Sequence, residues 1–165
     1  MTQFARPDSD VSVGAWTTSP LFSKVDEVTL DTGDFIQAST AGNECELGLG
    51  DVTDPAVGTG HVLSVTFRQG AGASFSVRII KGTTVIHTYT TTTNTGGGFV
   101  TETSTLSEAE ANNIDDYPDL RIRLTLDNSV NCRVAQCFFE CPDAPAGGTV
   151  LKDVIQMGMT VPVAR

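Results

Sequence analysis

The chain has 165 residues, and its 20 acidic against 10 basic residues give a net charge of −10 at pH 7. This length suits a single domain with one hydrophobic core. No apolar run approaches the roughly 20 residues of a transmembrane helix, and the negative charge opposes binding to phosphate backbones. We therefore expect no membrane span and no nucleic-acid partner, and the absence of an N-terminal apolar stretch predicts synthesis in a cytoplasm.

Short runs of alternating or β-branched residues, separated by Gly, Asp, Asn and Pro, predict strands along almost the whole chain. The predicted strands are 11–16, 34–38, 44–49, 61–68, 74–81, 83–92, 99–106, 119–126 and 132–141. A strand about every 8 to 12 residues is typical of a β-sandwich. We therefore expect an all-β fold, an antiparallel jelly-roll β-sandwich. Its core faces would hold Leu63, Val65, Phe67, Phe75, Val77, Ile79, Leu120, Ile122, Leu124 and Leu126.

One segment between strands has a helical pattern. Ser107 and Glu110 have the spacing of a capping box, in which each side chain bonds the other residue's backbone N–H. Ala111 and Ile114 complete one or two turns before Pro118 stops the helix. We expect one short helical crossover within the sandwich.

The two ends differ in composition from the middle. Residues 1–10 are polar and are predicted to form an N-terminal arm, followed by the jelly-roll domain at 11–142. Residues 143–165 are predicted to be a linker and an apolar C-terminal tail. The tail either adds a strand to its own sheet or packs on another chain, and both interpretations stay open. Its candidate interface residues are Val150, Leu151, Val154, Ile155, Met157 and Met159.

Four arginines alternate with core positions of the predicted strands: Arg68, Arg78, Arg121 and Arg123. Alternate residues of a strand point to opposite faces of the sheet, so these side chains point outward. If the strands are neighbours, the arginines form a positive stripe on an acidic protein. Such a stripe is a candidate surface for pairing with carboxylates of a partner protein.

The four cysteines permit three interpretations. Cys137 and Cys141 would lie about 13 Å apart on an extended strand, too far for a disulfide with each other. All but Cys132 fall on apolar faces, which favours reduced core cysteines. A disulfide from Cys45 to Cys137 or Cys141 and a zinc site are the other two interpretations, and no CxxC motif supports zinc.

Candidates for chemistry are few. His61 and His87 lie within strand patterns, away from any second His at metal-ligand spacing, so we interpret both as structural. We predict no catalytic residue, no metal and no cofactor. Three exposed aromatic residues could stack on a sugar: Trp16, Tyr89 and Tyr117.

Residues 6–143 resemble the jelly-roll modules of tailed-phage virion proteins. The likeness runs through segments 11–16, 21–27, 34–36, 60–68, 76–86, 106–114, 116–124 and 132–142. Such modules usually carry Val at the places of Cys137 and Cys141. Their fold is similar to carbohydrate-binding modules, and they act as structural or attachment units without catalytic residues. Since the module makes up nearly the whole chain, the resemblance implies a stand-alone capsid decoration, or cement, protein.

The leading hypothesis is a structural protein that binds the outer capsid surface of a bacteriophage virion and stabilises contacts between capsid subunits. Its expected partners are the major capsid protein and further copies of itself, as a homotrimer, with the arginines and the tail at the interfaces. The alternative is a glycan-binding module that attaches a virion to host cells through the three aromatic residues. A hydrolase is disfavoured, because nothing singles out a pair of carboxylates.

Overall fold

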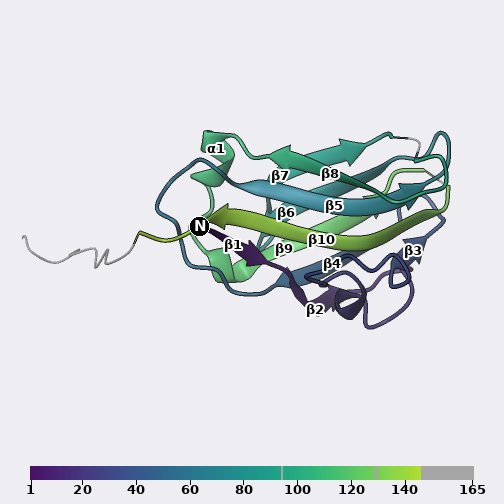
Figure 1. The fold of residues 1–165 in the computed structure, drawn as a ribbon, viewed down its shortest axis with the longest axis horizontal. Coiled ribbons are helices and arrows are strands. Elements are labelled where there is room, and N and C mark those ends of the chain that lie inside the picture. The colour runs from purple at the N-terminus through teal and green to yellow at the C-terminus, as the bar shows by residue number, and fades with distance from the viewer. Residues whose placement is uncertain (94, 129, 146–165) are drawn as a thin grey trace, which may run out of the picture.

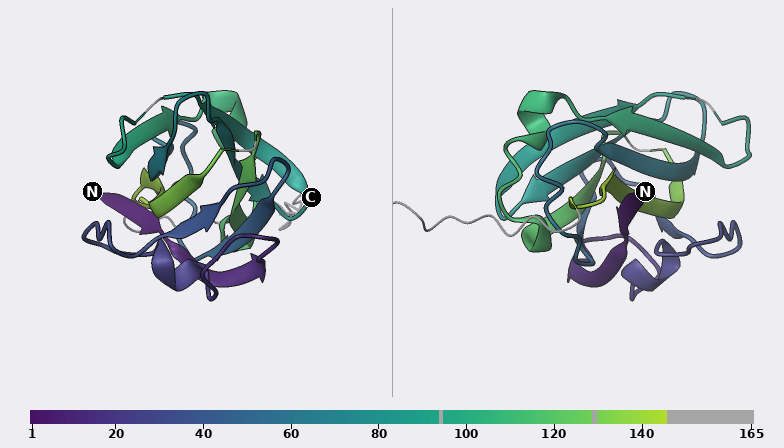
Figure 2. Two further views of the ribbon diagram at one scale, coloured as in Figure 1. Left: turned by 90° about the vertical axis from the view of Figure 1, so that its right-hand side faces the viewer. Right: turned by 60° about the vertical axis from the view of Figure 1, so that its left-hand side comes forward.

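The computed structural model describes residues 1–93, 95–128 and 130–145, and these form two five-stranded antiparallel sheets that pack face to face (Figures 1 and 2). The first sheet has the order β1-β10-β5-β8, with β3 also pairing with β10. Its strands are β1 (Thr2–Ala5), β10 (Cys132–Pro142), β5 (Val62–Gln69), β8 (Val100–Thr105) and β3 (Ile36–Ala38). The second sheet has the order β2-β4-β9-β6-β7. Its strands are β2 (Pro7–Ser12), β4 (Glu44–Leu49), β9 (Leu120–Leu126), β6 (Phe75–Lys81) and β7 (Thr84–Thr91).

The core lies between the two sheets and includes all the alternate side chains that the sequence predicted. Phe67 on β5 and Phe75 on β6 are fully buried, and their rings meet edge to face with centroids 5.1 Å apart. On β9 every second residue from Leu120 to Leu126 is buried. The predicted β-sandwich and its core faces are therefore confirmed.

The prediction of an N-terminal arm is wrong. Most of residues 1–10 lie in β1 and β2, which pair with β10 and β4 respectively. Both strands lie at the edge of a sheet, where much of a strand faces solvent. Each strand therefore needs few apolar residues, which is why the composition of residues 1–10 is polar. The predicted strand at 11–16 is also wrong. The strand β2 ends at Ser12, and Gly14, with a φ of +55°, turns the chain after it.

The helical segment agrees with the sequence. The helix α1 (Glu108–Ala111) begins at a capping box in which the Ser107 hydroxyl accepts from the Glu110 N–H. Two 3-10 turns complete the helical structure of the described chain, η1 (Phe22–Lys24) and η2 (Tyr117–Asp119). In the described ranges, no helix has the length and apolar character needed to span a membrane.

The predicted C-terminal tail lies almost entirely outside the described residues, which end at 145. This applies to the six candidate interface residues from Val150 to Met159. The two interpretations of the tail therefore stay predictions.

All four cysteines are buried and carry free thiols. Burial raises the pKa of the Cys132 and Cys137 thiols to about 12 and that of Cys141 to about 11, and it raises the pKa of Cys45 as well. The structure thus places the cysteines as the core interpretation predicts. Within residues 1–93, 95–128 and 130–145, no group of three or more His, Cys, Asp or Glu residues is arranged to hold a metal ion.

Thiol titration tests the state of these cysteines. A thiolate-specific reagent at pH 8 should react very slowly with the folded protein, because the thiols are buried and protonated. After unfolding in denaturant without reductant, four thiols per chain should react. A count of two would show a disulfide and contradict the structure.

Candidate functional site

The four arginines of the predicted stripe do not share one surface. Arg78 on β6 and Arg121 and Arg123 on β9 belong to the second sheet, and Arg68 on β5 belongs to the first. The prediction is wrong for Arg68 because the chain crosses from one sheet to the other between β5 and β6. Although β5 and β6 follow each other in sequence, they are therefore not neighbours in one sheet.

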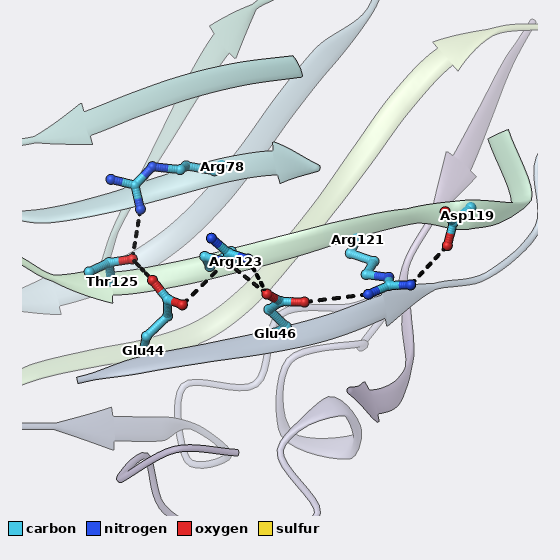
Figure 3. A network of polar contacts seen from close by, with 7 residues as sticks. All are labelled: Glu44, Glu46, Arg78, Asp119, Arg121, Arg123 and Thr125. Carbon is cyan, nitrogen blue, oxygen red and sulfur yellow. Dashed lines mark hydrogen bonds and ion pairs between the residues drawn. The ribbon is translucent and has the colours of Figure 1, made fainter. Parts of the chain in front are cut away.

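Two arginines of the second sheet, Arg121 and Arg123, are already paired with carboxylates of the same chain, whereas Arg78 donates to the Thr125 hydroxyl (Figure 3). Arg123 forms an ion pair and a hydrogen bond with Glu46, and its Nε lies 3.4 Å from a Glu44 oxygen. Arg121 lies between Asp119 at 3.0 Å and Glu46 at 3.6 Å. These ion pairs join β4 to β9 and neutralise much of the positive charge on this face.

Two of the three aromatic residues proposed as glycan contacts lie in the core. Trp16 is 3% exposed and its Nε1 donates to the Asn43 carbonyl at 3.3 Å. Tyr117 is 4% exposed and its hydroxyl lies 2.8 Å from His61 Nε2. The prediction is wrong for both, because each lies in a turn, where strand alternation gives no information about which side chain turns inward.

Tyr89, the third aromatic, is half-buried where the edge strands β7 and β8 approach each other. Its hydroxyl donates to the Glu102 carboxylate. Burial, and to a lesser extent this hydrogen bond, raises the pKa of Tyr89 to about 12. The phenol is thus engaged between the two sheets. Its polar end is already satisfied within the chain.

His87 connects three elements at the same edge. Its Nε2 lies 2.8 Å from Ser104 Oγ on β8, and its Nδ1 lies 3.0 Å from a Glu110 oxygen on α1. The catalytic triads of hydrolases have the same order of hydroxyl, imidazole and carboxylate. Here the imidazole is 8% exposed and the Glu110 carboxylate also accepts from the backbone and hydroxyl of Ser107. We interpret the cluster as a structural link between α1, β7 and β8, as predicted for His87.

Replacing Glu110 with glutamine tests this link. Hydrogen bonds from His87 and Ser107 lower the pKa of Glu110 from its ordinary value of 4.5 to about 2. The ionised carboxylate therefore stabilises the folded protein fully above about pH 4.5, and this stabilisation is lost as the pH falls toward 2. Because the carboxylate is one-third exposed, we expect Glu110→Gln to lower the free energy of unfolding by only about 1 kcal/mol at pH 7. Urea unfolding at pH 7, 4 and 2.5 should show this difference shrinking, and Glu108→Gln on the same helix serves as the control. An unchanged difference at pH 2.5 would contradict the assignment.

A cavity of about 330 Å³ is lined by residues from three loops, and we call it the loop-end cavity. These loops lie at the end of the sandwich opposite α1 (Figure 1). Three loops meet there: the β5–β6, β7–β8 and β9–β10 connections. Its volume falls at the lower end of the range for small-molecule sites, about 300–1,000 Å³. The lining residues are Arg68, Gln69, Gly70, Gly97, Val130, Asn131 and Arg133.

Two arginines lie side by side at this cavity. Arg68 on β5 and Arg133 on β10 are register partners in the antiparallel ladder, and both point away from the core. The Arg133 guanidinium stacks over the Phe35 ring, 4.5 Å from its centroid, and the Phe35 and Phe99 rings are 6.3 Å apart. Cation and aromatic rings thus form one surface beside the cavity.

Gln69 contributes a buried polar group to the same cavity. Its side chain is 2% exposed, and its Nε2 donates to the Thr93 carbonyl at 2.8 Å. Its Oε1 accepts no hydrogen bond from the described part of the chain. Because this oxygen is shielded from solvent, we count it with the packing around the cavity and not among the groups open to a ligand.

The sequence predicted only one of these cavity residues, Arg68, and assigned it to a different surface. In the sequence, Arg133 occupies an ordinary outward-facing position of a predicted strand. Its pairing with Arg68 follows from the β5–β10 register, which joins residues 65 positions apart in sequence. No local sequence signal could have found it.

Comparisons with known proteins identify the fold. No protein-family model matches the chain, and no curated protein sequence matches it. Among solved structures, the C-terminal CBM6 domain of LamC, a marine laminarinase from Zobellia galactanivorans, is 13% identical with a TM-score of 0.51, over 85% of this chain and 98% of that one. A family 35 carbohydrate-binding module from Clostridium thermocellum is also 13% identical with a TM-score of 0.48, over 86% of this chain and 98% of that one. The two antiparallel sheets and the likeness to the LamC domain together show that the chain has a jelly-roll β-sandwich fold.

Proposed function

We propose that the protein is a glycan-binding module whose ligand enters the loop-end cavity. The observation that carries this proposal is the convergence of polar residues on one small-molecule-sized cavity: Asn131 and the arginines at 68 and 133. The fold shared with carbohydrate-binding modules supports the proposal by analogy. This is the earlier glycan-binding alternative, moved to a different set of residues.

The chemistry of the cavity suits a sugar better than an apolar ligand. Sugar hydroxyls both donate and accept hydrogen bonds, and the lining offers acceptors and donors at several positions. The two lining glycines, Gly70 and Gly97, carry no side chain that could hide the backbone from a ligand. Phe35 and Phe99 add apolar ring surface beside the cavity, which suits the C–H faces of a pyranose.

Binding of a glycan array by the full chain, followed by calorimetry with the best ligand, tests the proposal. We expect Asn131→Ala to weaken binding about tenfold, equal to ~1.4 kcal/mol, because it removes hydrogen bonds to the ligand. Asn113→Ala, an exposed asparagine just after α1 at the opposite end, is the matched control and should bind normally. Equal weakening by both variants, or no binding to any glycan, would reject the proposed site.

A further inference from the structure

We propose that the glycan bound at the loop-end cavity is acidic, carrying a carboxylate or a sulfate ester held between Arg68 and Arg133. This inference rests on the proposed function and names the chemical class of its ligand. The charge of the two arginines, their geometry and the other residues that line the cavity supply the three parts of the argument.

The first part is charge. Directly opposite like charges on neighbouring strands destabilise a sheet, and the register places Arg68 opposite Arg133. The chain has 20 acidic residues, but in the ranges that the structure describes neither arginine forms an ion pair. Arg121 and Arg123, by contrast, are both paired with carboxylates. An anion between the two guanidinium groups of the cavity would relieve their repulsion.

The second part is geometry. Arg133 holds its guanidinium carbon over the Phe35 ring, 4.5 Å from the centroid, and its N–H donors make no hydrogen bond within the described chain. A planar guanidinium edge matches the two oxygens of a carboxylate or a sulfate group. Arg68 is exposed on the neighbouring strand and can approach the same group. The pair thus resembles an open clamp for one anionic group.

The third part is the rest of the cavity lining. Asn131 and the backbone of Gly70 and Gly97 offer hydrogen-bond donors and acceptors to hydroxyl groups, which a bare inorganic anion such as sulfate lacks. A sugar that bears both hydroxyls and an anionic group can contact this lining and the arginines together. This combination favours an acidic sugar over a neutral sugar and over a free anion.

The test uses matched glycan pairs with the full chain: polygalacturonate against its methyl ester, and a sulfated galactan against the same polymer after desulfation. We expect the acidic member of at least one pair to bind at least tenfold more tightly, with affinity that falls as salt rises. The pair whose two members differ in affinity identifies the anionic group as a carboxylate or a sulfate. Arg68→Gln should remove the preference, whereas Arg78→Gln, with the same change of charge on the other sheet, should retain it.

Other outcomes separate the two proposals. Equal binding of charged and neutral members, unchanged by Arg68→Gln, would overturn the acidic preference and leave glycan binding intact. Failure of all four polymers and of the glycan array would overturn glycan binding itself. Inorganic sulfate that competes as well, mole for mole, as the sulfated polymer's repeating unit would show an anion site without sugar recognition and overturn the inference. Unchanged thermal unfolding of Arg68→Gln establishes that the variant is folded.

Discussion

Replacing Phe67 with alanine is expected to lower the free energy of unfolding by about 3–5 kcal/mol. The ring is fully buried at the centre of the sandwich and contacts Phe75 of the opposite sheet edge to face. Alanine would leave a cavity between two sheets that are held apart by their other side chains. Because small domains are stable by only about 5–15 kcal/mol, the variant should be close to unfolding at 37 °C.

Urea unfolding followed by circular dichroism measures this effect. Phe4→Ala is the control, because Phe4 is 49% exposed on the edge strand β1 and should change the stability by less than about 1 kcal/mol. Similar losses for the two variants would contradict the placement of Phe67 at the core.

Replacing Trp16 with alanine is expected to cost a similar amount, about 3–5 kcal/mol, because the indole is buried and bonded to the Asn43 carbonyl. This outcome distinguishes a core tryptophan from a glycan contact on the surface. An exposed sugar-stacking tryptophan would instead give a stable variant with lost binding.

The conservative variant Trp16→Phe gives the second measurement. It should fold, with a smaller loss of stability, and bind glycans with the affinity of the unmodified chain, because the loop-end cavity does not include residue 16. Since Trp16 is the single tryptophan, unfolding of both variants is followed by circular dichroism instead of fluorescence. Normal stability of Trp16→Ala with abolished glycan binding would restore the surface interpretation.

The capsid decoration hypothesis stays a prediction of the sequence resemblance. The tail that would reach a capsid lies outside the described residues, and the arginines of β9 are paired within the chain. The same holds for the major capsid protein as partner, the homotrimer and the virion location. Co-sedimentation with purified capsids would test the decoration role, and glycan binding does not depend on its result.

The sequence by itself determined the fold class and the core faces. Alternation with a period of two identifies which residues of β5, β6 and β9 face inward, because successive side chains on a strand point to opposite sides. The capping box likewise identified α1 from local sequence, since both of its hydrogen bonds join residues three apart. These features depend on neighbours along the chain.

Only the tertiary structure decided which strands lie side by side and which groups meet. The register of β5 and β10 brings Arg68 to Arg133, and the crossing of the chain between sheets separates Arg68 from Arg78. The edge positions of β1 and β2 let a polar segment form strands, and turns direct Trp16 and Tyr117 into the core. Pairing between distant segments depends on the packing of the whole chain. The sequence therefore predicted the β-sandwich, whereas only the structure located the candidate site.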